Sequence, residues 1–326
     1  MSLLNESLNL NALPKMVMQQ QVPLADKNWF RTGGHARYYC QPTTELEFVQ
    51  ALFFAQHQGL SVFVLGQGAN ILISDDGFDG LVIHPKLQKI EQVFSDAMQA
   101  VCVKAEAGVV FDDLIEYCLN NNLIQLEEFS GIPGTVGGSI YINIHYYEFF
   151  LSDFLIEATV IDRRTGVLSR VDKAWFEFGY DTSKLHDQNY FLINATFMVK
   201  KASNLEISYA RGRKKEIIRH RVRRFPTTHT CGSFFRNFFP AEVAKTDKKL
   251  IYVAYYLDKL GIKGELCVGD AVVSHQHANM LVNRGSATSS DIFKLAKIMQ
   301  EKVLKEFGII PQPECQLIGF RKDQLL

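Results

Sequence analysis

The sequence has no excess of charge of either sign, because 35 Lys and Arg residues balance 35 Asp and Glu residues in 326. A neutral chain has no general electrostatic attraction to nucleic acid or membranes, so neither partner is expected. No apolar run approaches the roughly 20 residues that a membrane-spanning helix needs. The N-terminus lacks a basic segment followed by an apolar stretch, so no signal peptide is expected. These absences predict a soluble, cytoplasmic protein.

The six cysteines are scattered and form no C-x-x-C pair, which argues against a zinc site or a redox motif. We expect buried free thiols in a reducing compartment. His275 and His277 lie two residues apart without further candidate ligands nearby. No metal site is therefore expected.

A nucleotide-binding βαβ fingerprint is also missing. Val62–Asp75 contains two apolar runs around the turn Gly66-Gln67-Gly68-Ala69-Asn70. The fingerprint needs a third glycine and a following helix, whereas Ile71–Ile73 continues as a strand. The pattern is strand, glycine turn, strand, and it excludes a Rossmann site.

The glycine-rich stretch Gly131–Gly138 has four glycines and one proline within eight residues. Glycine lets the backbone pass close to a ligand, and successive N–H groups in such a loop form a nest for an anion. A cofactor pyrophosphate fits that nest. The alternative is a glycine-rich turn without a ligand.

The remaining pattern predicts an α+β protein, with a loose arm or short helix at residues 1–21. A capping box at Thr44 and Glu47 precedes residues with helical spacing that end near Gly59. Further helices are expected at about 111–121 and 289–307, from the spacing of their apolar residues. Strands are expected at 38–40, 62–65, 71–73, 81–84, 101–105 and 191–199, and a hairpin joins 158–162 to 167–171.

Six motifs in order give the chain a family resemblance. They are the two glycine stretches, NWFRTGGHA at 28–36, GSFFRN at 232–237, HANMLVN at 277–283 and PECQLIG at 313–319. Together they resemble the UDP-N-acetylenolpyruvoylglucosamine reductase family, often called MurB, over about residues 22–320. The short connection after Lys201 resembles the shorter, second type of that family.

The resemblance implies a two-subdomain FAD-binding fold of the vanillyl-alcohol oxidase type, followed by a C-terminal α+β substrate domain. We expect an arm at 1–21, the FAD domain at 22–204, the substrate domain at 205–312 and a return segment at 313–326. Non-covalent FAD and NADPH are the implied cofactor and reductant. The residues implied to line the FAD pyrophosphate are Gly66, Gly68, Ala69, Asn70, Gly131, Ile132, Pro133, Gly134, Thr135, Gly137 and Gly138.

The family reduces an enolpyruvyl ether on a UDP sugar, with hydride going to the β-carbon and a proton to the α-carbon. The resemblance makes Ser233 the proton donor and Glu314 a stabiliser of the substrate carboxylate. The alternatives are a turn serine and a surface carboxylate. Arg236, Asn237 and Asn279 are the implied substrate-binding residues.

Asp181 departs from the family pattern. The family motif G-Y-R-x-S has arginine where this chain has Gly179-Tyr180-Asp181-Thr182-Ser183. Two negative groups about 4 Å apart repel by about 4 kcal/mol at an effective dielectric near 20, so a substrate carboxylate needs another cation. Lys184, Arg236 and Arg31 are the candidates, although Lys184 would face away from Asp181 in a strand.

The segment after the second glycine stretch also departs. The family usually shows N-A-G-A-Y-G, and this chain has Asn143-Ile144-His145-Tyr146-Tyr147-Glu148. The added volume is expected to narrow the substrate channel. The cofactor motifs are thus kept while the substrate side is altered.

Residues 211–224 contain eight Arg or Lys in fourteen positions. Three interpretations remain open: a solvated helix face, a phosphate-binding edge for the UDP sugar or NADPH, and nucleic-acid binding. Pro226 is expected to end this helix.

The sequence favours an FAD-dependent reductase that makes UDP-N-acetylmuramate for peptidoglycan precursors. Two alternatives are a degenerate member that binds FAD but has lost the reaction, and a flavin oxidoreductase with another substrate. A small-molecule UDP sugar is the expected partner, and the chain is expected to be a monomer or weak dimer.

Overall fold

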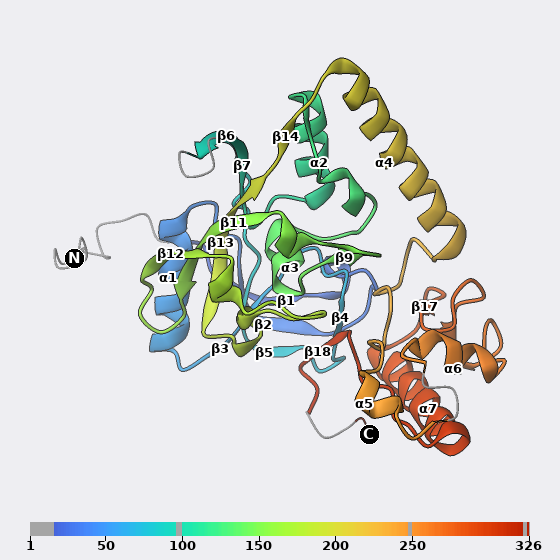
Figure 1. The fold of residues 1–326 in the computed structure, drawn as a ribbon. Coiled ribbons are helices and arrows are strands. Elements are labelled where there is room, and N and C mark those ends of the chain that lie inside the picture. Colours follow the sequence, from blue (N-terminus) through green and yellow to red (C-terminus); the bar gives the residue numbers. More distant parts are fainter. Residues whose placement is uncertain (1–15, 96–99, 247–249, 322–324, 326) are drawn as a thin grey trace.

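The computed structural model describes residues 16–95, 100–246, 250–321 and 325. Its three larger sheets have four, five and three strands (Figure 1). None of the helices in these ranges is long and apolar enough to cross a lipid bilayer. The predicted α+β class is confirmed.

The first sheet has the strand order β1-β2-β5-β3. Its strands are β1 (Gln19–Pro23), β2 (His35–Cys40), β3 (Ser61–Val64) and β5 (Phe78–Ile83). β1 pairs antiparallel with β2, and β5 pairs parallel with β2 and β3. The predicted strands are confirmed here. Most of the predicted N-terminal arm lies outside the described residues, and for Gln19–Gln21 the prediction is wrong because they pair in β1.

Helix α1 (Glu45–His57) connects β2 to β3 and begins where the capping signal predicts. The Thr44 side chain accepts a hydrogen bond from the backbone N–H of Glu47 at 3.2 Å. The reciprocal half of the box differs, because the Glu47 carboxylate accepts from the backbone of Thr43 at 2.6 Å. The helix start was therefore predictable, while the partner of Glu47 was not.

The second sheet has the antiparallel order β12-β11-β13-β7-β6. Its strands are β6 (Ile90–Ser95), β7 (Ala100–Glu106), β11 (Leu155–Asp162), β12 (Leu168–Asp172) and β13 (Tyr190–Met198). The predicted hairpin is β11 and β12, so it is confirmed. Helix α2 (Phe111–Asn120) buries the predicted face against this sheet.

Helix α3 (Val136–Tyr141) begins inside the glycine-rich stretch, where a loop was predicted, and continues three residues beyond it. Thr135 caps it by accepting from the N–H of Gly138 at 3.2 Å. Glycine pairs weaken a helix in isolation, so the surrounding packing decides this element. Its Val136 and Ile140 are fully buried in the core of the second sheet.

The C-terminal part begins with the long helix α4 (Asn204–Arg224), which runs along one edge of the molecule (Figure 1). It starts at a capping box on Ser203 and ends before Phe225, so Pro226 follows its end as predicted. The elements after it are α5 (Pro240–Val243), α6 (Val253–Lys259), β15 (Cys267–Val268), β16 (Ala271–Val273), β17 (Leu281–Asn283) and α7 (Ser289–Phe307). The predicted helix at 289–307 is confirmed.

The chain then returns to the N-terminal half. Strand β18 (Gln316–Ile318) pairs parallel with β4 (Ile71–Ile73), the strand that follows the first glycine turn. The shorter elements are β8 (Leu123–Ile124), β9 (His145–Tyr146), β10 (Phe149–Phe150) and β14 (Lys200–Lys201), and the 3-10 turns Ala25–Lys27, Glu127–Phe129, Leu151–Asp153, Ala174–Phe176 and Lys184–Asp187.

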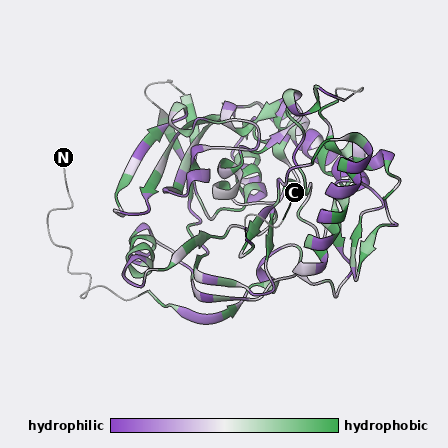
Figure 2. Cartoon of the chain, turned by 90° about the horizontal axis from the view of Figure 1, so that it is seen from below, coloured by the Kyte–Doolittle hydropathy of each residue, from purple (hydrophilic) through white to green (hydrophobic). Residues whose placement is uncertain are grey.

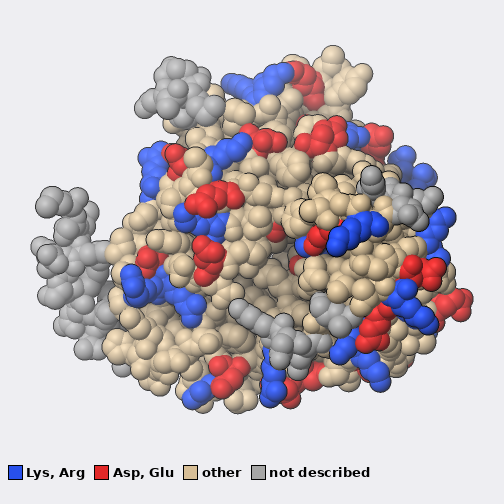
Figure 3. Space-filling model, turned by 60° about the horizontal axis from the view of Figure 1, so that its bottom comes forward, with Lys and Arg blue, Asp and Glu red and all other residues tan. Residues whose placement is uncertain are grey.

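Hydrophobic residues form separate cores beneath the two larger sheets and around α7. The core around α7 includes Phe30 and Leu72 from the N-terminal half. Figure 2 shows hydrophilic and hydrophobic residues together along the helices, as expected of elements with one face inward. Basic and acidic side chains are interspersed on the face in Figure 3.

Candidate functional site

A cavity of about 540 Å³ opens between the two glycine stretches and the C-terminal part of the chain. This volume lies in the range of small-molecule and cofactor sites. Every residue predicted to line the FAD pyrophosphate lines this cavity. The structure therefore brings the two stretches together, although Gly131 lies 61 positions after Asn70 in the sequence.

The first glycine turn joins β3 to β4 and packs without room for side chains. Gly68 has a φ of +67°, and a Cβ there would lie 2.5 Å from the carbonyl oxygen of Lys27. A Cβ on Gly66 would lie 2.8 Å from Oγ1 of Thr135 in the other stretch. Both glycines are thus required by backbone conformation or close approach.

Asn70 ends this turn with a side chain whose polar atoms are unsatisfied. Both its amide nitrogen and its amide oxygen are buried and have no partner among the described residues. A buried polar atom without a partner costs about 1–3 kcal/mol. Because Asn70 lines the cavity, its amide fits a polar ligand in the cavity, as a dinucleotide cofactor would supply.

The second stretch provides a smaller nest than predicted. The N–H groups of Val136, Gly137, Gly138 and Ser139 donate to Val109, Ala107 and Thr135. They are therefore unavailable to an anion. For Val136, Gly137 and Gly138, which lie within the predicted stretch, the prediction of a nest is wrong. In the described chain, the N–H groups of Gly134 and Thr135 have no hydrogen-bond acceptor.

Ser233 and Glu314 are brought together by the backbone of the C-terminal part, at the lining of the same cavity. The backbone N–H of Glu314 donates to the carbonyl oxygen of Phe234 at 2.9 Å, and Phe235 forms a bridge with Pro313. Both Ser233 and Glu314 line the cavity. The turn at Gly232-Ser233 and the C-terminal segment thus place a hydroxyl and a carboxyl at one site.

Burial governs the protonation of Glu314. Desolvation, with the charge of Asp181 added, raises the pKa of Glu314 well above its ordinary value. Burial also raises the pKa of Asp181 to about 6, against the opposing charge of Arg236. Two carboxyl groups close together in low dielectric cannot both ionise easily. Of the two carboxyl groups, Glu314 is therefore the one whose protonated form burial favours more strongly.

Asp181 lines the cavity from a turn, and not from the strand that was considered when Lys184 was judged to face away from it. Its φ is +55°, and a 3-10 turn begins at Lys184. Its Oδ1 lies 3.5 Å from Nδ1 of His145, while its Oδ2 is buried without a partner among the described residues. The neighbouring Tyr180 accepts a hydrogen bond from the amide of Asn237 at 2.9 Å.

None of the three cations predicted to replace the arginine lines the cavity. Lys184 pairs with Glu177 at 2.6 Å, so its charge is directed outside. Arg236 forms two hydrogen bonds to Glu242, at 2.7 and 2.8 Å, and lies over the ring of Phe239. The placement of Arg236 in the substrate site is therefore not supported.

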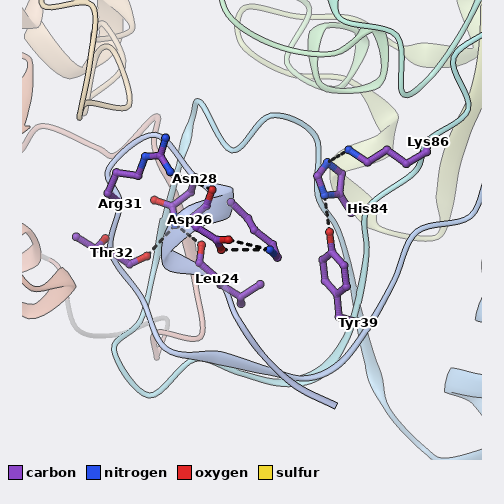
Figure 4. A network of polar contacts seen from close by, with 9 residues as sticks. Leu24, Asp26, Asn28, Arg31, Thr32, Tyr39, His84 and Lys86 are labelled. Carbon is purple, nitrogen blue, oxygen red and sulfur yellow. Dashed lines mark hydrogen bonds and ion pairs between the residues drawn. The ribbon is translucent and has the colours of Figure 1, made fainter. Parts of the chain in front are cut away.

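Arg31 is held in the segment that connects the first two strands. Its guanidinium donates to the carbonyl oxygen of Asp26 at 3.2 Å (Figure 4). Asn28 is buried and donates to the carbonyl oxygens of Leu24 and Thr32, both at 2.8 Å. This N-terminal motif therefore stabilises its own loop and packs against Gly68, whose carbonyl oxygen accepts from Trp29.

The two asparagines predicted to bind substrate line the cavity but are engaged with the protein. Asn279 accepts from the N–H of Phe235 at 3.0 Å and donates to the Phe235 carbonyl at 2.7 Å. Asn237 donates to Tyr180 and accepts from the N–H of Val253 at 3.2 Å. Both amides position the loop that carries Ser233.

The basic helix α4 divides its charges between structure and site. Arg213 pairs with Glu128, and Lys214 pairs with Asp112 and Glu116. Arg221 lines the cavity and donates to the carbonyl oxygen of Gly131 at 3.0 Å. Burial lowers the pKa of Arg221, but a guanidinium remains charged in proteins.

Sequence reasoning missed His145 and Arg221 as residues of the site. His145 was noted only for its volume, and Arg221 only as one charge in a basic run. A signal for His145 was present in the sequence. One segment that departs from the family pattern carries an acid, Asp181, in place of a base, and the other carries a base, His145, in place of a small residue. Proximity of residues 36 positions apart is a property of the fold, so spacing could not reveal it.

Comparisons with known proteins agree with this geometry. Residues 36–172 match the model of an FAD binding domain, and residues 225–318 match that of the UDP-N-acetylenolpyruvoylglucosamine reductase C-terminal domain. The chain is 31% identical to the UDP-N-acetylenolpyruvoylglucosamine reductase of Synechococcus sp. (strain JA-3-3Ab), covering 95% of this chain and 94% of that protein. It is also 31% identical to the protein of that name from Chlamydia trachomatis serovar A, with 93% and 97% covered.

The fold is shared with a solved structure of similar length. The UDP-N-acetylenolpyruvylglucosamine reductase (MurB) from Thermus caldophilus superposes with a TM-score of 0.75 at 25% identity. The match covers 93% of this chain and 99% of that chain.

Proposed function

Because this chain belongs to the UDP-N-acetylenolpyruvoylglucosamine reductase family, we propose that it reduces UDP-N-acetylglucosamine enolpyruvate to UDP-N-acetylmuramate with FAD and NADPH. One observation carries the proposal: the glycine stretches and the pair Ser233 and Glu314 line one cavity. A cofactor held by the glycine stretches would share the cavity with a substrate held at Ser233 and Glu314. The product belongs to peptidoglycan precursor synthesis.

The residues present fit FAD. The unsatisfied amide of Asn70 and the free N–H groups of Gly134 and Thr135 offer polar partners, and Gly66 and Gly68 allow close approach of the backbone. The sequence lacks the tandem of histidines that bicovalent flavin attachment requires in distant relatives, so we infer that the cofactor is held without a covalent bond. When bound, FAD supplies two-electron transfer as hydride from NADPH to the double bond.

Ser233 and Glu314 would act on the substrate. The Ser233 hydroxyl donates a proton to the α-carbon as the β-carbon receives hydride, so the double bond gains two hydrogens and NADPH is oxidised. Glu314 is kept neutral by burial, so it donates a hydrogen bond to the carboxylate, where negative charge develops. Asn237 and Asn279 hold the Ser233 loop in place.

The wider assignments are proposals on the same basis. Residues 22–204 would hold FAD and residues 205–312 the UDP sugar, and residues 313–326 would return Glu314 to the site. Arg221 is the cavity residue suited to a phosphate of substrate or cofactor. A small soluble substrate fits a cytoplasmic monomer or weak dimer.

The test is NADPH oxidation by the FAD-loaded protein, with the product identified by mass. Under anaerobic conditions we expect continuous NADPH oxidation only with UDP-N-acetylglucosamine enolpyruvate, and a product heavier by two hydrogens. UDP-N-acetylglucosamine, which lacks the double bond, is the control and gives no oxidation beyond the single reduction of the bound flavin. If the FAD-loaded protein oxidised no NADPH with the enolpyruvyl compound, it would be a family member that has lost the reaction.

A further inference from the structure

The substrate side of the cavity is short of positive charge. The described residues that line the cavity include two carboxyl groups, Asp181 and Glu314, and three basic groups, His145, Arg221 and His277. A substrate whose reacting end carries a carboxylate is repelled by an ionised Asp181 unless a cation lies next to it. The question is which of the three basic groups can serve.

Arg221 and His277 are poorly placed for this task. Arg221 is bound to the Gly131 carbonyl and lies over Phe225, on the side of the glycine-rich stretch. Nδ1 of His277 accepts from the N–H of Asn279, and burial with the charges of Arg224 and Lys263 lowers the pKa of His277 to about 4. His277 is therefore neutral at physiological pH.

His145 is held beside Asp181 by three contacts. It pairs with Phe150 in the β9–β10 hairpin, and the two rings stack with centroids 5.2 Å apart. The ring of Tyr180 lies 4.8 Å away on a tilted plane. Nδ1 lies 3.5 Å from Oδ1 of Asp181. This arrangement fixes the plane of the imidazole and directs one nitrogen to the carboxylate.

The other nitrogen of His145 is free. Nε2 makes no hydrogen bond within the part of the chain that the structure describes, and His145 lines the cavity. A histidine whose Nδ1 donates to a carboxylate can present Nε2–H to a second anion. The orphaned Oδ2 of Asp181, buried in the same cavity, marks this as a site built for a further polar group.

We propose that His145, oriented by Asp181, is the cation of this chain that receives the substrate carboxylate, in place of the arginine of its relatives. This inference rests on the proposed function, because it assumes a substrate that ends in a carboxylate. In the complex, Nδ1–H donates to Asp181 and Nε2–H donates to the substrate. The imidazolium then lies between two carboxylates, and the substrate is held next to Ser233 and Glu314.

Proton uptake on binding follows from the surroundings of His145. Burial lowers the pKa of His145 in the free protein, so it favours the neutral ring before substrate enters. Its facing ionisable groups are Asp181 and Tyr180, with Glu314 next to them. The 3-10 turn Glu127–Phe129 packs on β9 and carries two further carboxylates. Glu127 accepts a hydrogen bond from the N–H of Gln125, and Glu128 accepts one from Arg213, so both are engaged elsewhere. A substrate carboxylate adds the anion that favours the charged ring.

The experiment is calorimetric titration of the oxidised, FAD-loaded protein, without NADPH, so that no turnover occurs. UDP-N-acetylglucosamine enolpyruvate is titrated at neutral pH in two buffers with different heats of ionisation. We expect uptake of about one proton per substrate bound, and an affinity that falls as the pH rises. UDP-N-acetylglucosamine, which lacks the carboxylate, should bind without that uptake.

Variants separate this role from a structural one. His145→Ala should weaken binding of the enolpyruvyl compound by roughly ten- to a hundredfold and abolish proton uptake, with FAD content kept. His145→Lys carries a permanent charge, so it should restore binding without uptake and flatten the pH dependence. His57→Ala, at an exposed position on α1, is the matched control and should behave as the unaltered protein.

The outcomes distinguish the two levels of the account. If the unaltered protein bound neither ligand, the proposed function and this inference would both fail. If it bound and reduced the enolpyruvyl compound, but His145→Ala kept the same affinity and proton uptake, only the assignment of His145 would be overturned.

Discussion

Ser233 is the residue whose replacement should separate the two halves of the reaction. Ser233 lines the cavity together with Glu314 and is not among the glycine-stretch residues that would hold FAD. Ser233→Ala should leave flavin reduction by NADPH unchanged, and it should slow reoxidation by the enolpyruvyl substrate by about 10²–10⁴-fold, the usual contribution of a positioned acid. Anaerobic rapid-mixing absorbance measures both steps.

Ser290→Ala provides the matched control, since Ser290 lies in the first turn of α7, donates its hydroxyl hydrogen to Asp75 and does not line the cavity. Its two half-reactions should match those of the unaltered protein. A Ser233→Ala variant that reoxidised at the normal rate would show that another group donates the proton.

Asp181 should destabilise the protein as the pH rises. Burial raises its pKa from 3.8 to about 6, so below pH 4 it is neutral in both folded and unfolded chains. Between about pH 4 and 6 the unfolded chain ionises first, and stability is lost as the pH rises through the folded-state pKa. Asp181→Asn removes this loss.

The variant should therefore match the unaltered protein at pH 4 and be more stable at pH 7, by the order of 1–3 kcal/mol. Thermal unfolding midpoints of the FAD-free proteins at the two pH values measure the difference. Asp76→Asn, at an exposed position without described side-chain contacts, should change neither midpoint. A less stable Asp181→Asn at pH 7 would mean that ionised Asp181 stabilises the fold.

The sequence predicted cofactor residues better than substrate residues, for a physical reason. At Gly66 and Gly68 a Cβ would approach other atoms too closely, so these positions favour glycine, and glycine can be recognised in the sequence. Arg236 stands in a motif that predicted substrate binding, but its guanidinium forms an ion pair with Glu242 on α5. The contact between His145 and Asp181 joins strand β9 to a turn 36 positions later in the chain, and only tertiary structure reveals it.

At the scale of elements, the turn between β3 and β4 is the most sensitive to one methyl group. Gly68→Ala adds a Cβ that meets backbone atoms of Lys27 and Asn28 at 2.5 and 2.6 Å, at a positive φ. The turn must then move, so we expect little or no FAD in the purified protein. Flavin absorbance per chain measures this.

Gly59→Ala tests the effect of backbone strain alone. Gly59 has a φ of +62°, but a Cβ at this position would have no other atom within 4 Å. The variant should lose about 1–2 kcal/mol of stability and keep its full FAD content. Equal FAD content in the Gly68→Ala protein would show that the turn does not shape the cofactor site.

Helix α4 should depend on one lysine among its many basic residues. Lys214 is buried and pairs with Asp112 and Glu116 of α2, both at 2.9 Å. Lys214→Ala should lower stability by about 1–3 kcal/mol, because it removes packing and two ion pairs. Lys215→Ala, on the exposed face of the same helix, should change it by less than about 0.5 kcal/mol. Equal unfolding midpoints would contradict this anchoring role.

Helices with a regular apolar spacing were predictable, whereas elements set by context were not. α2 and α7 bury the residues that their spacing marks. α3 contains two glycines and was expected to be a loop, yet its fully buried Val136 and Ile140 hold it as a helix. The positive φ at Asp181 was not predicted, because the residue types around it do not require one.

At the scale of the whole molecule, the cavity exists because distant segments meet. β18 pairs with β4, so the segment that carries Glu314 is joined to the first glycine turn. The Ser233 turn is joined to the same segment through Phe234. The family resemblance predicted a return segment at 313–326. Its position beside β4 is set by the packing of the whole chain and could not be read from the order of the motifs.

The most direct test is whether the flavin held in this cavity is both reduced by NADPH and reoxidised by the enolpyruvyl substrate. The FAD-loaded protein is reduced anaerobically with NADPH, then mixed with UDP-N-acetylglucosamine enolpyruvate while flavin absorbance is followed. The account predicts rapid bleaching and then rapid return of the absorbance, with formation of the reduced sugar. Bleaching followed by a return no faster than with UDP-N-acetylglucosamine would contradict it.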